Sequence, residues 1–441
     1  MSQSWGRYGN TSRRDSRSLE LLTCVAALTT FLPYLAVPIG RSSALQVGNF
    51  LLLFAAMLTS AVLALRRSFV LCVLVVVPML VSTYWVAIQG RLEPSARTSI
   101  AFSVSALGVL GSALAQRPNM LRMLIRGVSL GILLNVIMGI IQIISYRHGS
   151  FPLMQLYRTN PSFSTPGPSY ALYVKRPFGL FSEPSSLCSA VGPWIILLGG
   201  LISGDQTVVA FGRLDGYLCR LSILGGVFLI VASRSGFAIV VAVLLPVAYL
   251  LSHRKRRTPF GGVTPPWRFL VFLLGGLSLA GVVYNTLLSR LRSSHTWSDR
   301  WSSFRSGLEL LLGSVHHLIL GAGPGQSSQL LLALHSAGLT NSSNIASALA
   351  AYSVDTGLLG ILALLGLSFG EFRAILCSSE ISVGLLAGLC LGFALLAATS
   401  YNSLAPCWLL GGILWQWDLV ASRPTVRSIA VGSLRDSGLR F

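Results

Sequence analysis

The sequence contains little charge, and acidic residues are especially scarce. Only 10% of its 441 residues are charged, and 13 acidic side chains face 33 basic ones. A soluble globular domain carries roughly 25% charged residues, so a chain built from soluble domains is excluded. Lysine is nearly absent as well, because only Lys175 and Lys255 occur and arginine supplies the rest of the positive charge.

Motifs for metal, disulfide or nucleotide chemistry are also missing. The seven cysteines form no CxxC pattern, lie in or beside apolar runs, and are expected to pack as small apolar side chains. His316 and His317 have no third ligand at a suitable spacing, so no metal is predicted. The glycine-rich stretch 321–325 lacks the lysine and Ser/Thr of a P-loop and is expected to form a turn. No cofactor is predicted.

Long apolar runs dominate what is present. Hydrophobic residues make up 53% of the chain, and its mean hydropathy is +0.70. About 20 consecutive apolar residues cross a bilayer as a helix, so we predict an all-α polytopic membrane protein with about 12 transmembrane helices, forming one integral membrane domain over 1–441. The predicted spans are 19–38, 44–65, 68–89, 98–115, 120–145, 185–203, 217–232, 235–251, 267–287, 346–369, 382–399 and 404–420.

The distribution of arginine and lysine sets the expected orientation. With the N-terminus inside, 21 of the 33 basic residues fall in cytoplasmic segments, as the positive-inside rule requires. We therefore expect a multi-pass protein of the inner (cytoplasmic) membrane, with cytoplasmic tails at 1–18 and 421–441. Nucleic acid is not an expected partner, because the arginines lie in short loops between apolar runs.

Two long loops are predicted on the outer side, at about 146–182 and 289–345. The first is rich in Pro, Ser and Tyr and is expected to lack regular structure. The second contains an amphipathic stretch, 297–315, whose apolar residues recur at helical spacing. We predict that it forms a helix lying at the membrane surface.

Positive charge also collects on the predicted outer face, where the positive-inside rule does not require it. Arginine binds phosphate well because its planar fork donates two parallel hydrogen bonds, so these residues predict a site for an anionic lipid diphosphate. Arg234 lies in a turn of only a few residues. The alternative interpretation is that Arg234 binds no ligand and only extends its charged group to the membrane interface. The outer basic residues considered are Lys175, Arg176, Arg234, Arg290, Arg292, Arg300 and Arg305.

Two acidic residues are candidate catalytic groups, and each has a structural alternative. Glu183 lies where the first outer loop meets an apolar run, with Ser182 expected to cap a helix and Pro184 suited to its first turn. Glu183 is then either a partner of the helix dipole or a general base. Asp355 lies in an apolar stretch, where a carboxylate is costly and often functional. It pairs with the helix dipole instead if a helix starts near Ser353.

Four stretches, in this order, resemble the superfamily of O-antigen polymerases and O-antigen ligases. They are RPFGLFSEPSSL (176–187), SRSGFAIVV (233–241), the stretch from DRWSSFRSGLELL to HHLILGAGPG (299–325), and DTGLLG (355–360). The resemblance covers roughly residues 170 to 370, and the N-terminal helices match only in character.

The resemblance implies a membrane glycosyltransferase that uses an undecaprenyl-diphosphate-linked oligosaccharide and needs no metal. By motif, the arginines that hold the diphosphate correspond to Arg176, Arg234 and Arg300. We predict Glu183 and Asp355 as catalytic carboxylates. The secondary candidates are Lys175, Arg305 and His335.

Polymerisation of lipid-linked repeat units, for O-antigen or exopolysaccharide, is the favoured activity. Ligases of this family carry a histidine about nine residues before an acidic residue in the last large loop; here no histidine precedes Asp355 at that spacing, and His335 is twenty residues upstream. Ligase-type transfer to a lipid or protein acceptor is the first alternative. A lipid-oligosaccharide transporter or a membrane scaffold are the others. The expected partners are the lipid-linked donor and acceptor, membrane lipids, and a chain-length regulator.

Overall fold

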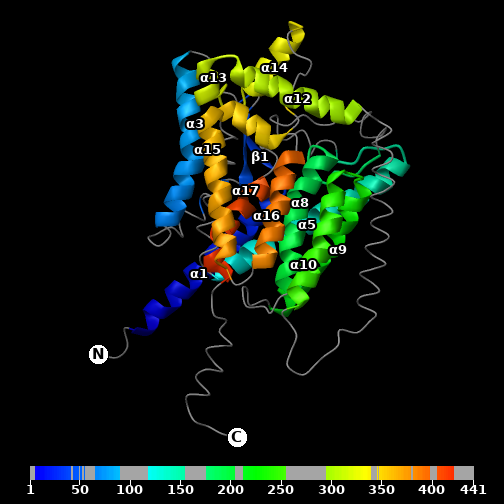
Figure 1. Ribbon diagram of the computed structural model, residues 1–441. Coiled ribbons are helices and arrows are strands. Elements are labelled where there is room, and N and C mark those ends of the chain that lie inside the picture. The colour runs from blue at the N-terminus through cyan, green and yellow to red at the C-terminus, as the bar shows by residue number, and fades with distance from the viewer. Residues whose placement is uncertain are drawn as a thin grey trace.

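The computed structural model shows a bundle of helices (Figure 1). Its helices and strands are given below with their bounds. The residues that the structure describes are 5–40, 43–48, 50, 51, 54, 65–89, 118–153, 175–203, 212–254, 295–338, 345, 347–378, 381–397 and 405–421.

Four of these helices are long and apolar enough to cross a membrane: α5 (Pro118–Arg147), α8 (Pro184–Ser203), α9 (Arg213–Ala232) and α15 (Ala348–Leu376). Shorter apolar segments lie in α3 (Leu65–Ile88), α10 (Phe237–Arg254), α16 (Ile381–Ala397) and α17 (Ala405–Leu414). A mostly helical fold with candidate membrane-spanning helices is therefore confirmed, whereas the count of about 12 spans stays a prediction. The predicted spans 98–115 and 267–287, and most of 44–65, lie outside the described residues.

Helix α8 forms the centre of the bundle and packs against α9, α10 and α16. Nearly all of its side chains are buried. Glycines allow this close packing, as is common between membrane helices. A Cβ atom on Gly192 would lie 2.5 Å from the ring of Phe237 on α10, and one on Gly200 would lie 2.5 Å from Val383 on α16. The Trp194 indole also donates a 2.8 Å hydrogen bond to the carbonyl of Pro406 at the start of α17.

The N-terminal part differs from the sequence-based prediction. Helix α1 covers Trp5–Thr29, so the expected tail 1–18 is helical from Trp5 onward. The predicted first span, 19–38, ends early and is followed by an antiparallel hairpin of β1 (Ala36–Gly40) and β2 (Ser43–Gln46). Pro33 explains the early end, because proline disfavours the helical conformation in the residue before it.

The predicted last two helical regions contain breaks. The span expected at 404–420 is divided into α17 and α18 (Trp417–Ala421). The span expected at 346–369 is a longer helix, α15, in which Gly357 adopts a non-helical conformation with φ 66° and ψ −155°. Glycine tolerates positive φ because it has no Cβ atom.

The segment predicted as the second outer loop contains three helices rather than one. The predicted amphipathic helix is confirmed as α12 (His295–Leu312), and α13 (Val315–Leu320) and α14 (Ser327–Ser336) follow it. Figure 1 shows the three together at one end of the bundle. Trp301, Phe304, Leu308 and Leu312 of α12 remain exposed, and Trp301 is 64% exposed. An exposed apolar face of this kind suits a helix at a membrane surface.

An ion cluster joins α5 to the start of α9. Asp215 is 2% exposed and forms ion pairs with Arg122 at 2.5 Å and with Arg126 at 2.6 Å. Its Oδ2 atom also accepts a 3.3 Å hydrogen bond from the Gly212 amide, so the same carboxylate caps α9. Two elements 90 residues apart in the chain are thereby fixed at this end of the bundle.

Replacing Asp215 with asparagine is expected to destabilise the protein. The two arginines would lose their counter-charge in a largely buried site, and breaking one partner of a buried ion pair costs about 3 kcal/mol. The measurement is the thermal unfolding midpoint of the purified protein in detergent. The matched control is Glu309→Gln, which breaks the exposed pair with Arg305 and should cost about 0.5 kcal/mol. Equal midpoints for the two variants would contradict the expectation.

Candidate functional site

The segment 175–183 is irregular, yet most of it is buried against α5. Gln142 of α5 accepts hydrogen bonds from the amides of Phe178 and Gly179, both at 2.9 Å, and donates one of 2.9 Å to the Gly179 carbonyl. Asn135, two turns earlier on the same helix, accepts a 2.8 Å bond from the Leu180 amide. We call Asn135 and Gln142 the amide clamp.

The amide clamp explains how an irregular segment persists inside an apolar bundle. Non-helical backbone at membrane depth is tolerated only where its polar groups find partners within the protein. Asn135 is itself held, since its amide nitrogen donates to the carbonyls of Phe31 and Gly131 at 3.1 and 3.0 Å. Gly179 has φ +59°, and a Cβ there would lie 2.6 Å from the Asn135 oxygen, so glycine is required.

The clamped segment leads directly into the N-terminus of α8. Pro184 is the first residue of this helix, as predicted. Glu183, rather than Ser182, occupies the capping position, because its carbonyl accepts the first helical hydrogen bond, from Leu187 at 3.1 Å. The Glu183 carboxylate also accepts a 3.3 Å bond from the Ser186 hydroxyl. It is partly exposed, so it keeps access to a ligand.

Arg234 lies in the turn between α9 and α10, which packs against the first turns of α8. The Cys188 thiol and the Ser233 hydroxyl are 2.9 Å apart. Arg234 is exposed and has φ +49°, directly after the C-cap of α9. Glycine commonly occupies this position in a helix end, and a non-glycine residue there costs of order 1 kcal/mol.

Three of the predicted site residues therefore lie at one end of the bundle: Arg176 in the clamped segment, Glu183 at the start of α8, and Arg234 in the turn beside it. Lys175 is exposed next to Arg176, also with a left-handed backbone, φ +49°. Neither Arg176 nor Arg234 takes part in the ion pairs found among the described residues. Within the described ranges, no acidic side chain therefore neutralises these two guanidinium groups.

Asp355 belongs to a second cluster, which is fully buried. Its carboxylate accepts hydrogen bonds from the amides of Gly325 and Ser327, at 2.7 and 3.0 Å, and so caps the N-terminus of α14. Asp355 does not begin its own helix, which is capped by Ser347. A carboxylate committed to two backbone amides fits a positioning role better than proton transfer.

The break at Gly357 ties the loop 321–325 to α15. It frees the carbonyls of Val354 and Asp355, which accept hydrogen bonds from Ala322 and Gly323 at 2.8 and 3.0 Å. Ser82 of α3 donates another 2.7 Å bond to the Asp355 carbonyl. The predicted turn at 321–325 is confirmed, and its role here is to dock against the broken helix.

The remaining candidates are not brought together with these residues. Arg305 is exposed and pairs with Glu309 on its own helix at 2.9 Å. His335 is exposed near the end of α14, and the side chain of Arg300 lies outside the described part of the structure. His316 stacks on Trp85 with ring centroids 4.8 Å apart. Within the described ranges, no three His, Cys, Asp or Glu residues are arranged to hold a metal ion.

The start of α17 connects the N-terminal part of α8 with the buried region around Asp355. Cys407 donates a hydrogen bond of 3.2 Å to the carbonyl of Ser189 on α8. The next residue, Trp408, packs against Tyr352 on α15, with ring centroids 5.8 Å apart. The N-terminal regions of α8 and α15 are thus linked through one buried helix.

No protein-family model matches the chain, and no curated protein matches it. The resemblance to O-antigen polymerases therefore rests on the quoted motifs alone. Activity and substrate enter below as proposals.

Sequence-based reasoning missed the amide clamp and Asp215. A signal for the clamp is present, since Asn135 and Gln142 are amide side chains seven residues apart in an otherwise apolar run, and such residues lie on one helix face. Asp215 lies beside a predicted span, and its partners Arg122 and Arg126 are about 90 residues away in the sequence. The sequence alone therefore does not reveal this pairing.

Replacing Gln142 with leucine is expected to destabilise the segment 175–183. Two buried backbone amides would lose their acceptor, and each unsatisfied group costs about 1–3 kcal/mol. Gln142→Glu is not a matched control, because its second oxygen would face the Gly179 carbonyl that the Gln142 amide now donates to. Trypsin cleavage after Lys175 provides the measurement, because Pro177 blocks cleavage after Arg176, and it should accelerate in the leucine variant. Identical cleavage rates in wild type and Gln142→Leu would contradict the clamp.

Asp355→Asn separates a positioning role from a purely catalytic one. Asparagine keeps the shape but has only one acceptor oxygen, so its NH₂ group would face a backbone N–H. We expect a loss of about 2 kcal/mol, seen as a lower thermal midpoint together with lower activity. A variant that loses activity at an unchanged midpoint would instead indicate a catalytic carboxylate.

Proposed function

We propose that the protein is a membrane glycosyltransferase that polymerises undecaprenyl-diphosphate-linked oligosaccharide repeat units. The proposal places it in the inner membrane, with its active site on the outer face and both termini in the cytoplasm. The quoted motifs supply the substrate class. The arrangement of charged residues at the start of α8 supplies the physical support.

The observation that carries the proposal is the backbone of Arg234. This residue occupies a left-handed conformation at the end of α9, where glycine would relieve strain, yet it is an exposed arginine. Backbone strain that is retained at a charged side chain supports a functional requirement for that side chain. Arg176 and Glu183 lie at the same end of the bundle, so cationic and acidic groups are available together.

In the proposed reaction, Arg176 and Arg234 bind the diphosphate of the donor. An acceptor hydroxyl attacks the anomeric carbon of the donor sugar, its proton passes to Glu183, and the bond from that carbon to the diphosphate breaks. The electron pair leaves on undecaprenyl diphosphate, whose charge the guanidinium groups stabilise in a site of low dielectric constant. No metal is required for this charge balance.

The other candidates have subsidiary roles in this proposal. Asp355 acts as a positioning residue that holds the loop 321–327. Lys175 adds positive charge beside Arg176. Arg300, Arg305 and His335 belong to the second outer loop, which would cover the lipid-linked substrate. A chain-length regulator is a candidate partner.

Two substitutions of Arg234 test the proposal. Arg234→Gly should keep or raise the thermal midpoint, because glycine tolerates the left-handed backbone, yet abolish polymer formation. Arg234→Lys keeps the charge but loses the bidentate fork, and should lower activity at least about tenfold. Polymer length and lipid-linked intermediates are measured in cells at equal protein levels. The control is Arg213→Lys, an exposed arginine at the start of α9.

The lipid-linked intermediates decide between the alternatives. Single repeats that accumulate on lipid in the Arg234→Gly strain support the polymerase, whereas long polymer left on lipid would indicate a ligase. Translocation of lipid-linked repeats by purified protein in vesicles, without polymer growth, would indicate a transporter. Normal polymer in the glycine variant would overturn the role of Arg234.

A further inference from the structure

A cavity of about 410 Å³ lies between α15, α16 and α17. It follows the antiparallel pair α15 and α16, from Leu349 and Leu396 at one end to Ile375 and Leu385 at the other. Phe372 and Phe393 line it and are about half exposed, at 49% and 50%, so it opens toward the outside of the bundle. Around a helix long and apolar enough to cross a membrane, as α15 is, such an outward opening would face lipid.

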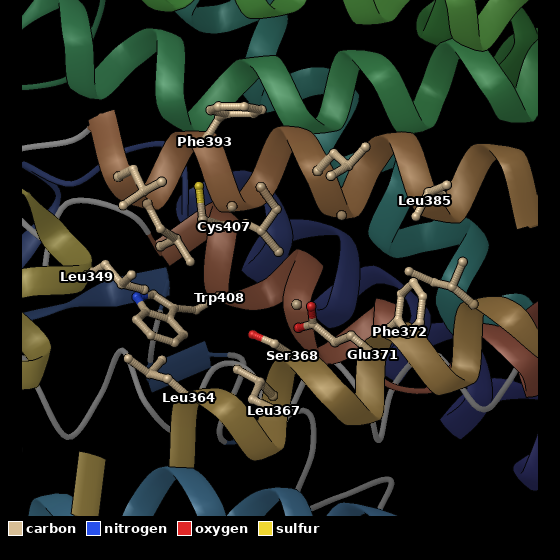
Figure 2. A pocket seen from close by; sticks show the side chains of 18 residues that line it. Leu349, Leu364, Leu367, Ser368, Glu371, Phe372, Leu385, Phe393, Cys407 and Trp408 are labelled. Atoms are coloured by element: carbon tan, nitrogen blue, oxygen red, sulfur yellow. The ribbon is translucent and has the colours of Figure 1, made fainter. Parts of the chain in front are cut away.

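Two polar side chains, one turn apart on α15, interrupt this apolar lining. Figure 2 shows the Ser368 hydroxyl and the Glu371 carboxylate directed into the space between the three helices. Glu371 takes part in none of the ion pairs or hydrogen bonds found in the described part of the chain. Gly411 of α17 makes room for it, because a Cβ there would lie 3.1 Å from Oε1 of Glu371.

A carboxylate without a partner is costly in an apolar environment and commonly marks a binding site. The chain has 13 acidic residues against 33 basic ones. The basic residues nearby do not satisfy Glu371, since Arg373 lies almost opposite on the helix and is exposed. Among the described residues, no cation therefore pairs with this carboxylate.

We propose that this cavity binds one membrane phospholipid with a primary-amine headgroup, whose ammonium group pairs with Glu371. The proposal does not depend on the glycosyltransferase activity. Such a lipid matches both parts of the site. Its acyl chain fits the apolar groove, and its ammonium group can donate hydrogen bonds to the Glu371 carboxylate.

The dimensions of the site agree with this ligand. Glu371 lies five residues before the end of α15, roughly 8 Å along the helix axis, so a headgroup bound to it would lie toward that end of the groove. The cavity extends from there toward the middle of the bundle, in the direction of an acyl chain. At roughly 30 Å³ for a group the size of a water molecule or a methylene, it holds about a dozen chain carbons.

Two variants address the two halves of the site. Glu371→Gln keeps the shape of the side chain but removes the charge. Gly392→Leu fills the cavity without a clash, because nothing lies within 4 Å of a Cβ at this position. The controls are Glu309→Gln, an exposed acidic residue on α12, and Gly216→Leu, a helical glycine on α9 that also has no neighbour within 4 Å.

Native mass spectrometry of the purified full-length protein measures lipid binding. The probes are phosphatidylethanolamine, phosphatidylcholine and phosphatidylglycerol with identical acyl chains. We expect wild type and both controls to prefer phosphatidylethanolamine at least about tenfold, the scale of one hydrogen bond to a charged group. The preference should vanish in Glu371→Gln, and Gly392→Leu should lose binding of all three lipids.

Three outcomes would overturn the proposal. If Glu371→Gln keeps the full preference for phosphatidylethanolamine, Glu371 does not contact the headgroup. If wild type binds the three lipids equally, the site recognises acyl chains and not headgroups. A dimer that Gly392→Leu dissociates would mean that a second copy occupies the groove. If Gly392→Leu elutes as aggregate, the isosteric Glu371→Gln variant alone decides the question.

Discussion

The need to hydrogen-bond every backbone amide and carbonyl inside an apolar bundle determines the local structure around the candidate site. Regular helices meet this need by themselves, whereas the irregular segments 175–183 and 321–327 do not. Gln142 and Asn135 supply partners for the first segment. Asp355 and the carbonyls freed at the break in α15 supply them for the second. A few polar side chains on apolar helices thus fix both irregular segments, and the first of these carries Lys175, Arg176 and Glu183.

The sequence predicts the helices well, because apolar length and helical spacing are local properties. The bounds of α5, α8, α9, α10 and α16 lie within a few residues of the predicted spans. The hairpin after α1, the break at Gly357 and the division of the last span were not predicted. Each depends on a single proline, glycine or pairing partner, and an average over an apolar run does not detect it.

The residues of the candidate site were also identified only in part from the sequence. Arg176, Glu183 and Arg234 were identified because charge beside a helix end stands out in an apolar chain, and they do share one end of the bundle. The amide clamp, Asp215 and Glu371 were not identified, because their importance comes from groups distant in sequence. Asp215, for example, pairs with arginines about 90 residues away. Asp355 was identified, but its cap on α14 could not be foreseen from its own helix.

The break in α15 has a mechanical consequence. Two backbone hydrogen bonds from the loop 321–325 satisfy carbonyls that a continuous helix would use internally. A Cβ on Gly321 would lie 2.3 Å from the Asp355 carbonyl oxygen, so the two backbones are in direct contact. Helix α15 therefore cannot straighten while the loop is docked, and the loop cannot leave without exposing unpaired carbonyls. The conformation of the loop 321–325 and the break in α15 therefore depend on each other.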